Sequence, residues 1–151
     1  MVVDWYDFAK DIVHREADRV VTRHRLDAEA PYFRDHFPGR PVLPGVLATE
    51  ALLQAGRVLL SGQFAGGERW VLGSARAIRF SRFLEPGQWM VCDVKLLEAS
   101  ADQARIAAIC GVSEGAQIAL EAVGDLPQVA SGRLVLRPAR LGGWAPVAQA
   151  P

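Results

Sequence analysis

The strongest pattern in the chain is a run of apolar residues at helical spacing over residues 45–60. Its sequence is GVLATEALLQAGRVLL, and apolar side chains fall on nearly every side of the helix that it predicts. A helix that is apolar all round is normally a buried helix. Pro44 fits the first turn, because the N–H group that proline lacks has no partner within a helix at that position. The pattern therefore predicts a buried helix over residues 45–60.

Most of the remaining chain has the pattern of β-strands. Turn-rich pieces separate runs of β-type residues, and the segments that we expect as strands are 19–27, 70–80, 88–98, 104–112, 117–123 and 129–138. Residues 3–13 place their apolar side chains at roughly helical spacing, which predicts a short amphipathic helix. A buried helix followed by a series of strands predicts an α+β fold in which an antiparallel sheet wraps around the helix.

Composition narrows the class of protein. The chain has 151 residues, of which 50% are hydrophobic, with 17 basic and 17 acidic side chains. This length and apolar content suit a single domain over residues 1–151, with a core over about 20–137 and a peripheral tail over 139–151. A neutral charge balance argues against nucleic acid as the main partner. The apolar content also suggests a buried subunit interface.

The sequence also bears on location and on metal binding. No apolar run reaches the roughly 18 residues of a membrane-spanning helix, so we expect no membrane insertion. The start of the chain does not resemble a secretory signal, which favours a cytoplasmic location. Cys92 and Cys110 lie in apolar stretches and are expected to be buried core residues. Few histidines accompany them, and no set of ligands at zinc-binding spacing is visible, so we expect no metal.

The start of the predicted helix has unusual backbone chemistry. Because Pro44 lacks an N–H group, the amides of Gly45 and Val46 are the first free donors at the helix N-terminus. Such donors, together with the helix dipole, polarise a carbonyl or bind an anion. Gly45 also allows a ligand to approach the backbone closely.

Two titratable residues lie close to these amides in the sequence. His36 lies on a proline-rich loop, and Glu50 lies on the helix with Gln54 four residues later on the same face. A neutral imidazole is a base near pH 7, and a carboxyl group buried among apolar side chains can stay protonated. This set suits removal of a proton α to a carbonyl together with expulsion of a β-hydroxyl group. From residue types alone, His36 could equally be structural, and Glu50 could simply pair with Arg57 or Arg79.

Residues 36–54, HFPGRPVLPGVLATEALLQ, resemble the signature of the FabZ-type 3-hydroxyacyl-[acyl-carrier-protein] dehydratases. The family pattern is H-F-P-x-x-P-x-x-P-G-V-L-x-x-E-A-x-x-Q, and every fixed position is matched. RFSRFLEPGQ at 79–88 and VASGRLVL at 129–136 are weaker matches to the same family, so the resemblance covers roughly residues 20–137. These dehydratases are hotdog-fold enzymes of fatty-acid and polyketide synthesis.

The resemblance implies a fold, an assembly and roles for individual residues. It implies a single hotdog domain that forms homodimers or trimers of dimers. His36 would be the catalytic base and would act with the partner subunit's Glu50, with Gln54 in a supporting role. The amide of Gly45, next to Val46, would bind the thioester carbonyl. The substrate would be carried on the phosphopantetheine of an acyl carrier protein, with no metal or redox cofactor, and glutamate rather than aspartate at position 50 favours the plain dehydratase branch.

Some positions differ from the family pattern. Phe83 replaces the usual proline and Gln88 replaces an aspartate, which suits a specialised relative in a fatty-acid, polyene or polyketide pathway. Phe83 is expected near the mouth of an acyl tunnel.

Arg82 and Arg79 are candidate contacts for an acidic carrier protein, as is Arg76. Their spacing of three places neighbours on opposite faces of a strand, so these arginines are not expected to form one stripe.

Two other functions share features with this pattern. One is a hotdog thioesterase or acyl-CoA hydratase, and the other is a non-catalytic acyl-binding hotdog subunit. Thioesterases of this fold do not usually combine H-F-P with E-A-x-x-Q, so the resemblance favours the dehydratase.

Overall fold

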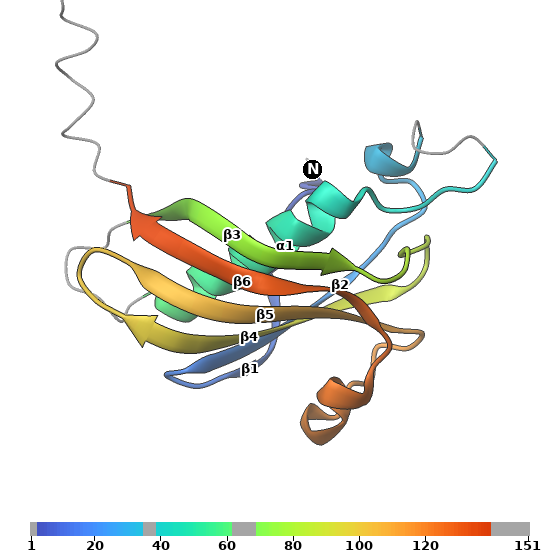
Figure 1. Cartoon of the computed structure of the whole chain (residues 1–151). Helices are drawn as coiled ribbons and strands as arrows, with labels where there is room; N and C mark the ends of the chain where they lie inside the picture. Colours follow the sequence, from blue (N-terminus) through green and yellow to red (C-terminus); the bar gives the residue numbers. More distant parts are fainter. Residues whose placement is uncertain (1–2, 35–38, 62–68, 140–151) are drawn as a thin grey trace, which may run out of the picture.

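An antiparallel sheet and one long helix form the framework of the protein, seen in a computed structural model that describes residues 3–34, 39–61 and 69–139. The strands are β1 (Asp11–Arg15), β2 (Arg19–Arg25), β3 (Trp70–Phe80), β4 (Trp89–Ala99), β5 (Ala104–Ser113) and β6 (Gln128–Pro138). Their order across the sheet is β1-β2-β4-β5-β6-β3. Figure 1 shows the helix α1 (Gly45–Leu60) running along one face of this sheet. The expected α+β fold is confirmed.

Helix α1 forms the centre of the main core. Leu52, Leu59 and Leu60 are fully buried on its sheet-facing side. The helix backbone lies so close to the sheet that a Cβ atom at Gly56 would lie 2.7 Å from Cδ1 of Ile106. Burial of each leucine is worth about 1.5–3 kcal/mol, so packing of this kind fixes the helix against β5. The predicted helix boundaries are confirmed at both ends.

The other face of the sheet carries a second, smaller apolar cluster. Val123 packs there with Val21 of β2 and Val91 of β4. Val123 belongs to the short 3-10 helix η2 (Leu120–Asp125), so the strand expected over 117–123 is wrong. The segment connects β5 to β6, which already pair with each other, and it covers the sheet instead of joining an edge.

The N-terminal helix expected over residues 3–13 is also wrong. The carboxylate of Asp4 accepts a hydrogen bond from the backbone N–H of Tyr6 at 3.0 Å and closes a turn. The chain then forms β1, in which Ile12 pairs with Thr22 of β2. Hydrogen bonds to a neighbouring strand thus replace those of a helix. The other predicted strands differ from the observed ones by no more than two residues at either end, and the predicted tail lies outside the described residues from position 140 onward.

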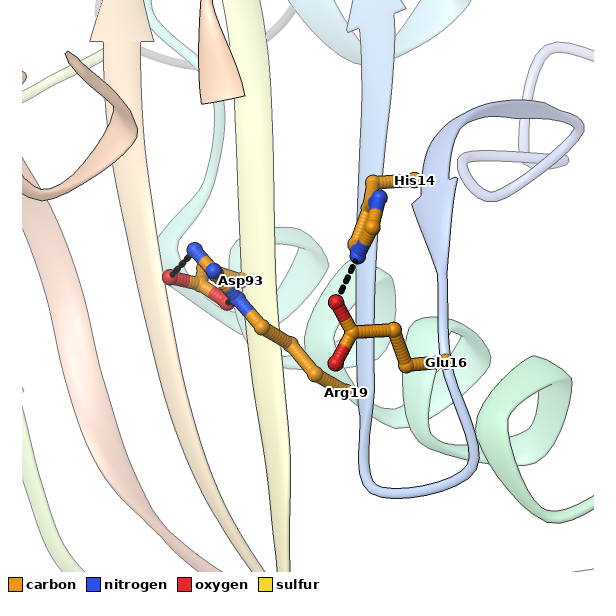
Figure 2. Close-up of polar contacts among 4 residues, drawn as sticks. All are labelled: His14, Glu16, Arg19 and Asp93. Carbon is orange, nitrogen blue, oxygen red and sulfur yellow. Dashed lines mark hydrogen bonds and ion pairs between the residues drawn. The ribbon is translucent and has the colours of Figure 1, made fainter. Parts of the chain in front are cut away.

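Two polar pairs lie near the start of β2, as Figure 2 shows. Nε and Nη2 of Arg19 donate to the two carboxylate oxygens of Asp93 at 2.9 and 3.0 Å, which joins β2 to β4. The hydrogen bond with Asp93 raises the pKa of Arg19. His14 lies 2.6 Å from the carboxylate of Glu16, next to the turn between β1 and β2. A two-pronged arginine–carboxylate contact restricts geometry, so the first pair helps to fix the register of these strands.

The two cysteines lie directly opposite each other on adjacent strands. Cys92 of β4 pairs with Cys110 of β5, and both are buried free thiols. The hydrogen bond with Cys92, together with burial, raises the pKa of the Cys110 thiol. The expectation of two core cysteines is confirmed.

The environment of His24 predicts a pH-dependent stability. The ring of His24 in β2 packs edge-on against Phe8, and burial lowers the pKa of this histidine, with a smaller opposing effect from Asp7. The unfolded chain therefore takes up a proton more readily than the folded one as the pH falls through about 6.5, and folding loses free energy in that range. We expect His24→Gln to reduce the loss of stability between pH 7.5 and 5.5, measured by denaturant unfolding. Equal losses in wild type and variant would contradict this origin.

Candidate active site

Helix α1 presents the predicted site residues on two different sides. From Gly45 to Glu50 the helix rises by about 7.5 Å and turns by about 140°. Gly45 and Ala48 face a cavity next to the end of β3. Gln54 contacts the N-terminal segment of the chain, and Glu50 contacts Gln54. The structure therefore groups these residues into two separate clusters within one chain.

Polar groups surround the carboxylate of Glu50. Nε2 of Gln54 donates to Oε1 of Glu50 at 3.1 Å. Nη1 of Arg57 lies 3.8 Å from the same oxygen, and the Glu50 side chain is 38% exposed. The expected burial of Glu50 among apolar side chains is wrong for the single chain, because its helix face meets the N-terminal segment and not the core. Pairing with Arg57, one of the two arginines considered, is confirmed.

The first backbone amides of α1 lie beside a cavity. The cavity has a volume of about 370 Å³ and includes Leu43, Gly45, Phe80 and Phe83 in its lining. The ring of Phe80 lies against Gly45, where an added Cβ would lie 3.2 Å from Cε1 of the ring. Pro44, the residue before the helix, makes no side-chain cap, and among the described residues the amides of Gly45 and Val46 have no acceptor. Val46 is 73% exposed. This end of α1 can therefore offer N–H groups to a ligand in a largely apolar cavity.

The predicted arginines separate into two places. Arg82 lines the cavity beside Gly45, together with Phe83. Arg76 and Arg79 lie on the outer face of the sheet, where Arg76 is opposite Arg133 of β6 and Arg79 is opposite Ser131. The expectation that Arg76 and Arg79 lie on opposite faces is wrong. A bulge between them, with Ala77 at a φ of 53°, adds one residue to β3 and returns Arg79 to the same face as Arg76.

Position 36 lies outside the described residues, so the role of His36 stays a prediction. Within residues 3–34, 39–61 and 69–139 there is no group of three or more His, Cys, Asp or Glu side chains that could hold a metal ion. The same part of the chain contains no helix that is both long enough and apolar enough to cross a membrane.

Two contacts at the site were missed from the sequence. The sequence predicts Phe80 only as part of a strand and not as a contact of Gly45. Its position in RFSRFLEPGQ, one of the weaker matches to the family, is a signal that could have pointed to the site. The N-terminal segment contacts Gln54 through the carbonyl of Tyr6 and the amide of Phe8. Backbone groups are present at every position, so no pattern of residue types marks that contact.

Solved structures with this architecture define the class of fold. A chain of the dehydratase heterocomplex ApeI:P from Xenorhabdus doucetiae superposes with a TM-score of 0.74 at 13% identity, over 99% of this chain and 93% of that one. A hypothetical thioesterase from Streptococcus pneumoniae, solved with coenzyme A, gives a TM-score of 0.63 at 8% identity, over 85% and 84% of the two chains. The protein has the hotdog fold that these dehydratases and thioesterases share.

Sequence comparison then identifies the family. Residues 12–114 match the model of the ApeI-like family, described as ApeI dehydratase, and the chain belongs to that family. It is also 40% identical over 106 residues to the 3-hydroxyacyl-[acyl-carrier-protein] dehydratase FabZ of Pelotomaculum thermopropionicum, covering 68% of this chain and 75% of that one. The FabZ of Blochmanniella pennsylvanica is 39% identical over 87 residues, and the match spans 56% of this chain and 58% of that relative. The resemblance to FabZ-type dehydratases is confirmed.

The contacts of Arg57 predict a structural role in addition to its proximity to Glu50. Nε of Arg57 donates to the carbonyl of Trp70 at 2.8 Å and joins α1 to the start of β3. Because Arg57→Met removes this partly buried hydrogen bond between α1 and β3, we expect a loss of about 1 kcal/mol in the free energy of unfolding. Arg40→Met is the matched control, since Arg40 is 75% exposed in its ion pair with Glu85. The control should change stability by less than about 0.5 kcal/mol, and equal effects in denaturant unfolding would contradict the interpretation.

Proposed function

We propose that this protein dehydrates a 3-hydroxyacyl thioester, carried on an acyl carrier protein, to the trans-2-enoyl thioester. The observation that carries the proposal is the start of α1, where the Gly45 amide meets an apolar cavity within a fully matched dehydratase signature. Membership of the ApeI-like dehydratase family supports it. The departures at Phe83 and Gln88 support a specialised fatty-acid, polyene or polyketide pathway.

In the proposed mechanism the thioester carbonyl accepts a hydrogen bond from the Gly45 amide. That amide and the helix dipole stabilise the negative charge that develops on the carbonyl oxygen. Neutral His36 removes a proton from C2, the C2–C3 double bond forms, and the C3–O bond breaks. Glu50 donates a proton to the departing hydroxyl group, which leaves as water. Arg57, at 3.8 Å, then stabilises the carboxylate that Glu50 has become.

We propose that each site is shared between two copies of the chain. Glu50 points about 140° away from Gly45 around α1, so it does not face the cavity of its own chain. Strand β3 is an edge strand of 11 residues with most of its positions exposed. A long exposed edge readily pairs with another strand. Pairing of β3 with its copy would form a homodimer, alone or within a trimer of dimers, and would bring the partner subunit's Glu50 toward the Gly45 cavity.

Other parts of the proposal concern the carrier and the setting. Arg82 is the better placed of the two arginines for an acidic carrier, because it lines the cavity that would take the acyl thioester, whereas Arg79 lies on the outer face of the sheet. Phe83 lines the same cavity and would shape the acyl tunnel. We propose that the chain works as one cytoplasmic domain without a metal or redox cofactor, since proton transfers and backbone amides suffice for this reaction.

The test is the conversion of a 3-hydroxyacyl thioester on carrier protein, followed by the ultraviolet absorbance of the enoyl product. We expect turnover by the wild type and a loss of about 10²- to 10⁴-fold in kcat for His36→Ala and for Glu50→Gln, because each removes a proton-transfer group. Glu85→Gln, which changes an exposed ion pair with Arg40, is the control and should keep full activity.

Three outcomes would overturn this proposal. They are no enoyl product from the wild type, full activity in both site variants, and release of free thiol as the main reaction. The last outcome would instead support a hotdog thioesterase.

A further inference from the structure

A short segment before β1, residues 4–8, folds back over α1, and we call it the N-terminal hook. Asp4 closes it by two contacts: its carboxylate accepts from the Tyr6 N–H at 3.0 Å, and its carbonyl accepts from the Asp7 N–H at 3.5 Å. Phe8 anchors its far end, since this side chain is 1% exposed. The hook therefore presents a carbonyl and an amide to α1 in a fixed arrangement.

The backbone of the hook forms hydrogen bonds with both the oxygen and the nitrogen of the Gln54 carboxamide. The N–H of Phe8 donates to Oε1 of Gln54 at 2.8 Å, and Nε2 of Gln54 donates to the carbonyl of Tyr6 at 2.8 Å. A flipped carboxamide would place donor against donor and acceptor against acceptor. The backbone of the hook thus determines which end of the carboxamide is the donor.

The second hydrogen on Nε2 of Gln54 forms the hydrogen bond with Glu50. Nε2 donates to Oε1 of Glu50 at 3.1 Å, so the same nitrogen bonds to both the Tyr6 carbonyl and the Glu50 carboxylate. Glu50 is 38% exposed and has several rotatable bonds. A contact from a fixed donor restricts where its carboxylate can lie.

Aromatic packing holds the hook in place. The ring of Phe8 lies 5.2 Å from that of His24, 6.4 Å from that of Tyr6 and 6.1 Å from that of Tyr32. These contacts hold the hook in addition to its hydrogen bonds with Gln54. Displacement of the Phe8 and Tyr6 backbone would therefore require repacking of buried rings.

We propose that the N-terminal hook is a positioning element for Glu50, acting through Gln54; the proposal rests on the function proposed above. A catalytic group displaced by about 1 Å loses about 10²-fold in rate, so a fixed carboxylate matters for proton transfer.

Charged and titratable groups from three elements surround this arrangement. On α1, Arg57 lies 3.8 Å from Glu50. The hook contributes the charges of Asp4 and Asp7, and β2 contributes His24 behind Phe8.

Asp4 offers a test that leaves the catalytic groups untouched. Asp4→Ala removes the side-chain acceptor that closes the hook, at an exposed position, whereas Asp4→Asn keeps an oxygen there. We expect Asp4→Ala to lower kcat about three- to tenfold with KM within about twofold, and Asp4→Asn to restore most of kcat. Ser100→Ala, which removes a similar side-chain acceptor from the turn between β4 and β5, is the matched control and should have no effect.

Gln54→Met tests the link itself. It keeps the side-chain length but removes the donor to Glu50, so we expect a fall in kcat of about 10- to 100-fold with KM within about twofold. A role in folding alone would not lower the kcat of the folded enzyme in this way. An active wild type with unchanged kcat in both Asp4→Ala and Gln54→Met would overturn the proposal.

A second readout separates this proposal from the proposed function. The side-chain amide signals of Gln54 in a ¹⁵N-labelled sample should shift with the titration of Glu50 in the wild type, and should lose that dependence in Asp4→Ala. An inactive wild type that shows this behaviour would contradict the dehydratase but support the positioning role. Gln54 signals that ignore the Glu50 titration in the wild type would overturn the positioning role, whatever the activity.

Discussion

The burial of α1 against the inner face of the sheet determines where the described residues of the candidate site lie. Close contact at Gly56 and the buried leucines fixes the rotation of the helix about its axis. That rotation directs Gly45 to the cavity beside Phe80 and directs Gln54, with Glu50 beside it, to the N-terminal hook. A helix that rotated freely could not hold an amide and a carboxylate at set positions, so the packing of the core is also a condition for the proposed chemistry.

In the proposed shared site, the two clusters on α1 explain how a small chain could offer half of each of two sites. Gly45 would supply a polarising amide to one cavity, and Glu50 would supply a carboxyl group about 140° away around the helix. The exposed edge of β3 lies next to the first cluster, because Phe80 ends that strand and packs on Gly45. A second copy at this edge would combine complementary halves.

Much of this arrangement could be predicted from the sequence, because it depends on local patterns. The apolar run over 45–60 determines a buried helix, and alternation in β-type residues determines most strands. The failures involve tertiary context. Residues 117–123 have strand propensity, but they connect β5 to β6, which already pair with each other. Asp4 closes a turn within the segment that has the helical pattern. The bulge after Arg76 and the contact of the Tyr6 carbonyl with Gln54 depend on backbone geometry, which residue types do not reveal.

Complementation between two inactive variants tests the shared site most directly. His36→Ala and Glu50→Gln chains, co-expressed in equal amounts, form mixed dimers in which one of the two sites has both intact residues. With random pairing, half of the dimers are mixed, so about a quarter of the wild-type turnover of 3-hydroxyacyl thioester should return. If His36 and Glu50 act within one chain, every site in the mixture keeps one defect, and turnover no higher than that of the separate variants would contradict the shared site.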